Sequence, residues 1–254
     1  MSAVIQSFGS PSANMLIATA MFVTAASVSQ SLEINDSNRR LIERKLYYTP
    51  AEKPGPAETT ISVKTLLVFF LAVTGVFHVI YSFTSNRPVA LRFIEYSITA
   101  SVMMMIIQLL SGEDNGDLVV ACAALIATTM FFGLVQDDRV RSRSTSTKAF
   151  YLGWIPFVVA WFFVIKRFFF SLSLSDKVPD FVRWIIWGEL ALFSCFALVQ
   201  YFFIVRPMGS AIGAETSGNE NALMRYAGAY NLLSITAKMF LALMAFFGLK
   251  NMNG

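Results

Sequence analysis

Residues 229–248 read AYNLLSITAKMFLALMAFFG and contain a single charged side chain, Lys238. The hydrocarbon core of a bilayer, about 30 Å thick, is crossed by roughly 20 apolar residues in helical form. This stretch is therefore long enough to span a membrane. Its lysine lies about eleven residues from the helix end near Gly248, or roughly 16 Å at 1.5 Å per residue. At that depth the amine does not reach the nearer surface comfortably.

Six more apolar stretches of similar length precede this one. The connections between them, such as SGEDNGD and QDDRVRSRSTSTK, are rich in turn-forming and charged residues. A spanning segment must satisfy its backbone groups internally, so we predict an all-α, rhodopsin-like bundle of seven transmembrane helices forming one domain, 1–254. The predicted spans are 13–32, 61–84, 89–111, 117–136, 148–171, 181–204 and 223–249.

The first connection, about 33–60, is the only long one. It contains NRRLIERKLYYTPAEKPGPAETT, which combines charged residues, Tyr47, Tyr48 and three prolines. We expect a loop with room for a short hairpin, whose strands the pattern does not place.

The composition restricts the class of protein further. Hydrophobic residues make up 56% and charged residues 14% of the chain, with a mean hydropathy of +0.59, whereas a soluble domain carries about 25% charged residues. The net charge of +4 includes no basic block, which argues against nucleic acid as a partner. Cys122 and Cys195 each lie in an apolar run, as buried thiols do. No metal-binding cluster, nucleophile elbow or phosphate loop indicates an enzyme.

The distribution of basic residues predicts the orientation. Many lie at the second, fourth and sixth connections and the helix ends they join, whereas SGEDNGD has none and the first connection is nearly balanced. The positive-inside tendency then favours a cytoplasmic N-terminus and an extracellular C-terminus. The basic residues on the predicted cytoplasmic side are Arg87, Arg92, Arg139, Arg141, Arg143, Lys148, Arg206 and Arg225, and the fifth connection opposes them with Lys166, Arg167, Lys177 and Arg183.

Lys238 has two interpretations. It is either a structural lysine paired with a carboxylate inside the bundle, or an amine kept dry for a Schiff base with an aldehyde. Removal from water favours the neutral amine, which is the nucleophile that such chemistry needs. Ser234 and Asn231 lie one and two turns before Lys238 on the same helix face, where they can hydrogen-bond a protonated imine or its counter-ion.

Two carboxyl groups also fall inside predicted spans, where an ionisable side chain costs at least about 2.5–3.5 kcal/mol on insertion scales. Glu95, in RFIEYSITASVMMMII, either supplies the anion that keeps such an imine protonated or forms a surface pair with Arg92. Glu189 shares a helical stripe with Phe193, Phe196 and Gln200 and is predicted to point inward. The alternative interpretation is that Glu189 is a structural or partly solvated group, since it lies about two turns from the predicted helix start.

Four motifs in order resemble those of the heliorhodopsins. RFIEYSITASVMM is similar to their third-helix signature and YNLLSITAK to the seventh-helix signature that ends in the retinal lysine. FSCFALVQ is similar to a stretch of their sixth helix, and FFGLVQDD to the end of their fourth. The resemblance covers predicted spans two to seven at consistent spacing.

The resemblance implies all-trans retinal as cofactor, an inverted topology and a homodimer in the lipid bilayer. Lys238 would form the protonated retinal Schiff base, Glu95 would be its counter-ion, and Ser234 would lie beside that pair. His78 would lie in a polar cavity. The residues implied to line the ring and polyene pocket are Trp161, Phe193 and Gln200.

The chain also departs from the family pattern. Met21 stands where the family often has a histidine, which leaves His78 as the only histidine and argues against a two-histidine proton-accepting cluster. The stretch MRYAGA before Tyr230 lacks a Glu-Arg pair common in the family. Glu189 stands where an apolar, leucine-like residue is expected.

Three functions remain open at this point. The favoured one is a light sensor, a photoreceptor whose helices rearrange to act on an unknown signalling partner. The alternative is a light-gated proton conductor, with Glu95, Glu189, His78 and Arg92 as proton-transfer candidates. A seven-helix transporter or receptor without retinal is the third, and a coloured purified protein would exclude it.

Overall fold

The computed structural model describes residues 7–8, 10–48, 57–84, 89–141, 146–174, 178–205 and 220–253. Seven of its helices are long and apolar enough to cross a membrane, which confirms the predicted all-α bundle. These are α2 (Pro11–Ser31), α4 (Val63–Phe83), α5 (Val89–Leu110), α6 (Gly116–Arg141), α7 (Lys148–Leu174), α8 (Asp180–Gln200) and α10 (Glu220–Lys250).

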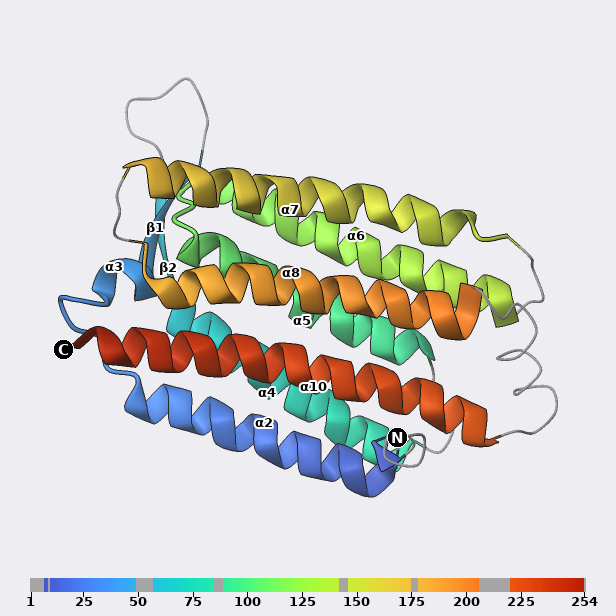
Figure 1. The fold of residues 1–254 in the computed structure, drawn as a ribbon. Helices are drawn as coiled ribbons and strands as arrows, with labels where there is room; N and C mark the ends of the chain where they lie inside the picture. Colours follow the sequence, from blue (N-terminus) through green and yellow to red (C-terminus); the bar gives the residue numbers. More distant parts are fainter. Residues whose placement is uncertain are drawn as a thin grey trace.

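The helices run side by side along one axis (Figure 1). In chain order, α2 packs on α4, α4 on α5, α5 on α6 and α6 on α7, while α8 packs on α10. Glycines permit close approach at two of these contacts, because the Phe22 ring lies against Gly75 and the Phe240 ring against Gly188. The second contact puts Gly188 of α8 at the depth of Phe240 of α10.

The observed helices extend beyond several predicted ends. Helix α6 continues to Arg141, α10 begins at Glu220, and α8 passes into a π-helical turn, Tyr201–Val205. Hydropathy detects only the part of a helix that lies in hydrocarbon, so polar turns outside the membrane are missed. The orientation also depended on Arg87, Arg143, Lys177 and Arg206, which lie outside the described residues.

The long first connection contains the expected hairpin. A short helix, α3 (Arg39–Ile42), leads into β1 (Glu43–Tyr48), which pairs antiparallel with β2 (Ala57–Ser62). The Tyr47 amide donates to the Asp114 carbonyl at 2.9 Å, so the hairpin rests on the turn between α5 and α6. The hairpin lies at the end of the bundle where α8 begins and α10 ends (Figure 1). We call this end the hairpin end.

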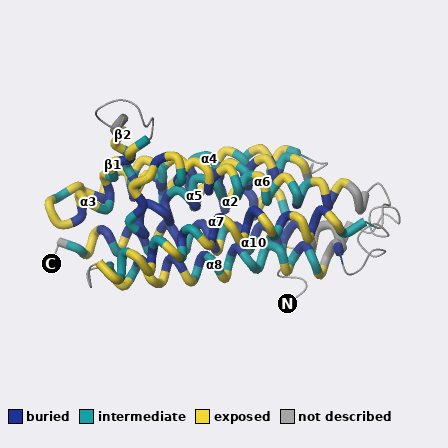
Figure 2. Tube along the Cα trace, turned by 90° about the horizontal axis from the view of Figure 1, so that it is seen from above, coloured by how far each residue is buried: buried dark blue, intermediate teal, exposed yellow. Residues whose placement is uncertain are grey.

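Buried and exposed side chains follow the pattern of a membrane protein. Figure 2 shows the buried positions gathered along the inner faces of the helices and the exposed ones outside. Large apolar side chains such as Leu16, Phe83 and Trp184 are exposed, while Glu95, Glu189 and Lys238 are buried. Lipid solvates the apolar exterior, whereas ionisable groups need partners that only the interior supplies.

Candidate retinal site and its polar surroundings

Lys238 and Glu95 meet in the interior of the bundle. The Lys238 ammonium donates to Glu95 Oε1 from α10 to α5, and the two side chains are only 4% and 1% exposed. Glu95 is therefore buried and paired with Lys238, which contradicts the surface pair with Arg92. Both interpretations of Lys238 predict a carboxylate partner, so the ion pair by itself does not separate a structural lysine from a reactive one.

Glu95 has a second partner that the sequence did not indicate. The Tyr81 hydroxyl, from α4, donates to Glu95 Oε2 at 2.7 Å. The Lys238 ammonium also lies 5.3 Å from the centre of the Tyr96 ring, within cation–π range. Tyrosines are common in apolar spans and carry no charge signal, so only the packing of α4 against α5 reveals these contacts.

Arg92 lies one turn before Glu95 but has a different neighbour. Its guanidinium carbon is 5.0 Å from the centre of the Tyr230 ring, on α10, and the side chain is buried. Arg92 is thus close to the site, beside an aromatic ring at the end of the bundle opposite the hairpin.

His78 lies in a polar environment near Glu95. Its Nδ1 atom is 2.9 Å from Asn14 Oδ1, and its ring meets the Tyr81 ring edge-on at 5.3 Å. Asn231 also bonds to Asn14, at 3.1 Å, and to the Phe8 carbonyl, at 2.9 Å. Asn231, a candidate partner of a protonated imine or its counter-ion, thus directs its amide nitrogen toward α2 and the residues before it.

Met21 lies in the apolar core of the bundle and is fully buried. This position is where the family often has a histidine, and here it supplies only packing. The polar partner of His78 from α2 is Asn14, two turns earlier on that helix, a residue that the sequence did not single out.

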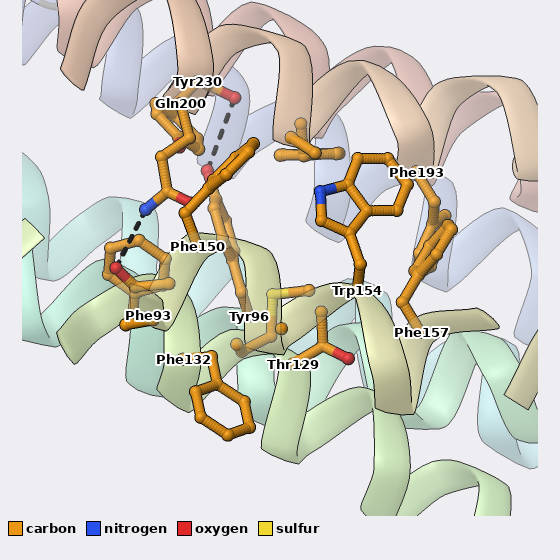
Figure 3. A pocket seen from close by; sticks show the side chains of 16 residues that line it. Phe93, Tyr96, Thr129, Phe132, Phe150, Trp154, Phe157, Phe193, Gln200 and Tyr230 are labelled. Atoms are coloured by element: carbon orange, nitrogen blue, oxygen red, sulfur yellow. Dashed lines mark hydrogen bonds between the residues drawn. The ribbon is translucent and has the colours of Figure 1, made fainter. Parts of the chain in front are cut away.

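Two adjoining cavities lie beside the lysine. The smaller, about 320 Å³, is lined by Lys238, Ser234, Thr99 and apolar neighbours. The larger, about 600 Å³, contains Gln200, Trp154 and a group of other aromatic side chains (Figure 3). Both cavities touch the same four side chains, which are Tyr96, Met130, Phe193 and Phe196.

The residues predicted to line the pocket divide into two groups. Phe193 and Gln200 do line the larger cavity, and Gln200 donates to the Gly133 carbonyl of α6 at 2.9 Å. Trp161 lines neither cavity. It packs behind Phe193 with ring centres 5.8 Å apart, while Trp154 and Phe157, about two turns and one turn earlier on α7, form the wall. The sequence of α7 carries aromatic residues on several helix faces. Only the rotation of the helix in the bundle decides which of these faces lines the cavity.

Glu189 is buried, one turn before Phe193 on α8. Neither carboxyl oxygen has a hydrogen-bond partner within the described part of the chain, and the same holds for Trp161 Nε1. Burial agrees with the prediction that Glu189 points into the bundle. A buried carboxyl without a partner is destabilised as an anion.

The two carboxyl groups come from different helices. Glu189, on α8, directly follows Gly188, against which the Phe240 ring of α10 lies. Glu95 lies about six residues after the α5 start, or about 9 Å from the opposite end of the bundle.

The fold and these buried groups define a seven-helix membrane protein of the rhodopsin class. Xanthorhodopsin, described as a light-driven ion pump with dual chromophore, superposes with a TM-score of 0.66 at 15% identity, over 98% of this chain and 93% of that one. The rhodopsin of Exiguobacterium sibiricum gives 0.64 at 14% identity, over 96% and 98%. At such identities these similarities establish the fold alone.

The family follows from the sequence comparison. The Heliorhodopsin family matches residues 11–249, nearly the whole chain, and the chain belongs to that family. This confirms the resemblance drawn from the four motifs. No curated protein sequence matches the chain.

Proposed function

We propose that this protein binds retinal covalently at Lys238 and acts as a light-responsive membrane photoreceptor. The observation that carries the proposal is the position of the Lys238 amine, at the wall of an apolar cavity that adjoins a larger aromatic one. Ligand pockets are largely apolar with few polar groups. An elongated apolar aldehyde fits such a space with its reactive end at the amine.

Retinal joined to a lysine through a C=N bond absorbs visible light and isomerises, and this is the chemistry it would supply here. The protein's own residues hold the charge. Glu95 provides the anion beside the Lys238 nitrogen, and Tyr81 fixes one oxygen of that carboxylate by hydrogen bonding. Tyr96, Phe193 and Phe196 form apolar walls that exclude water from the nitrogen. Ser234 adds a hydroxyl to the same cavity.

The test is the visible spectrum of the purified protein made with all-trans retinal. We expect a coloured protein whose spectrum changes reversibly on illumination. A colourless protein would reject the proposal and favour a seven-helix transporter or receptor without retinal.

We further propose the inverted orientation, with the N-terminus in the cytoplasm and the hairpin end of the bundle outside the cell. The balance of basic residues supports it, as does membership of a family whose members are inverted. A tag after Gly254 should react with impermeant reagents on intact cells, while a tag before Met1 should react only after the cells are opened. Labelling of the N-terminal tag alone on intact cells would reverse the assignment.

A second candidate function, light-gated proton conduction, is favoured by Glu189. Groups that bind and release protons are needed on both sides of the Lys238 nitrogen if a proton is to cross the membrane. Glu95 and Tyr81 lie on one side, with His78 and Arg92 near them. Glu189, one turn before the cavity residue Phe193, is the further buried carboxyl available to such a path, and neither of its oxygens has a partner within the described residues.

We expect that Glu189→Gln reduces a light-evoked proton current by about a hundredfold or more, the lower end of what one positioned acid–base group contributes. Glutamine keeps the shape but cannot carry the proton, so the visible pigment should remain. Currents are recorded from illuminated cells across voltage and pH gradients. Glu113→Gln, at a buried carboxyl in the α5–α6 turn, is the matched control and should conduct normally. A parent protein without photocurrent would leave only the sensor, and a current unaffected by Glu189→Gln would exclude this route.

A further inference from the structure

A series of hydrogen bonds links His78 to the backbone carbonyl of Phe8, a group that can only accept. Asn231 Nδ2 donates to this carbonyl at 2.9 Å and to Asn14 Oδ1 at 3.1 Å. Asn14 Oδ1 in turn lies 2.9 Å from His78 Nδ1. Asn14, His78 and Asn231 are at most 6% exposed, so water does not readily replace these bonds.

The Phe8 carbonyl fixes which atom donates and which accepts in each of these hydrogen bonds. A backbone carbonyl only accepts, so the Asn231 atom facing Phe8 must be the NH₂ group. That group has two hydrogens, and the second points at Asn14, so the facing atom of Asn14 must be its oxygen. If the Asn14 amide were rotated, two NH₂ groups would oppose each other in a buried site. Because Asn14 presents an oxygen, the His78 Nδ1 atom must carry a hydrogen.

We propose that Asn231 and Asn14 together hold His78 as the Nδ1–H tautomer, leaving Nε2 as the one ring atom that can accept a proton. In a neutral imidazole one nitrogen donates and the other accepts, so fixing Nδ1 fixes the whole ring. A histidine side chain in water prefers the opposite tautomer, with the hydrogen on Nε2. The two asparagines are thus positioning residues for His78.

The location gives this tautomer a use. His78 lies edge-on to Tyr81, which donates to Glu95, the partner of Lys238. The charged groups that interact with the ring are Glu95, Lys238 and Arg92, from α5 and α10. A proton displaced from the Lys238–Glu95 pair would find His78 ready to receive it at Nε2. This use rests on the proposed light response, whereas the tautomer itself does not.

The tautomer can be measured directly, because the chain contains a single histidine. Full-length protein labelled with ¹⁵N- and ¹³C-histidine in lipid, kept in the dark, gives imidazole signals from His78 alone by solid-state NMR. We expect a protonated Nδ1 and a bare Nε2. A bare Nδ1 with a protonated Nε2 would overturn the proposal, whatever the outcome of the tests for retinal and light response.

Two variants test the asparagines. Asn14→Leu removes the acceptor, so the preferred tautomer in water, with Nε2 protonated, should become the major form. Asn231→Leu frees the Asn14 amide to rotate, so both tautomers should appear. Gln108→Leu is the matched control, since Gln108 is a buried amide that bonds instead to the Val119 carbonyl, and it should leave His78 unchanged. Pure Nδ1–H in either asparagine variant would reject the role of that residue.

Discussion

Replacing Lys238 by alanine is expected to abolish the visible absorption of the protein completely. Retinal needs a primary amine to bind covalently, and within the described residues of the two cavities Lys238 is the only amine. Alanine leaves space for retinal but no nitrogen to join it. The measurement is the absorption spectrum of the purified variant made with all-trans retinal, compared with the parent at equal protein concentration.

Lys250→Ala is the matched control for this experiment. Lys250 lies at the end of the same helix, is exposed and contacts only the Phe246 ring among the interactions described. Its variant should keep the full visible band. A coloured Lys238→Ala protein would remove the assignment of the retinal lysine and return Lys238 to a structural role.

Neutralising Glu95 to glutamine is expected to give the second largest effect. Removing one partner of a buried ion pair costs about 3–5 kcal/mol, because the other charge is left buried alone. The protonated Schiff base should avoid this cost by releasing its proton, so its pKa should fall. Each unit of pKa corresponds to about 1.4 kcal/mol. The visible band should therefore disappear at a pH about two or more units lower than in the parent, and its maximum should shift.

A pH titration of the visible band measures both changes. Glu113→Gln again serves as the control, since Glu113 is a buried carboxyl that lies in the α5–α6 turn and accepts from the Asp114 and Asn115 amides instead. If Glu95→Gln left the titration and the maximum unchanged, another carboxylate would have to neutralise the charge. Glu189 would be the first to test.

Much of the fold was predictable because a bilayer imposes a simple rule on the sequence. Apolar runs of spanning length had to be helices, and all seven were found. The same rule made Glu95, Glu189 and Lys238 conspicuous, because an ionisable group in such a run is expensive. The strands of the hairpin were harder to predict, since β1 and β2 are short and polar and are held by pairing with each other and by the contact of Tyr47 with Asn115.

The polar partners were the least predictable part of the site. Tyr81 and Asn14 come from α4 and α2, and neither has a charge or a spacing that marks it. Asn231 was on the expected face of α10, yet it bonds across to α2. A helical face spans a wide arc, and the choice between two neighbours within that arc depends on how the helices are rotated and packed.

The sequence by itself determined the seven spans, the family and the three buried ionisable residues, because hydrocarbon penalises charge and unpaired backbone wherever the chain folds. Only the tertiary structure decided the partners. It joined Lys238 to Glu95, buried Glu189 without a described partner, and turned Trp161 behind Phe193. These outcomes depend on helix depth and rotation, which are set by many packing contacts between distant residues and leave no local pattern in the sequence.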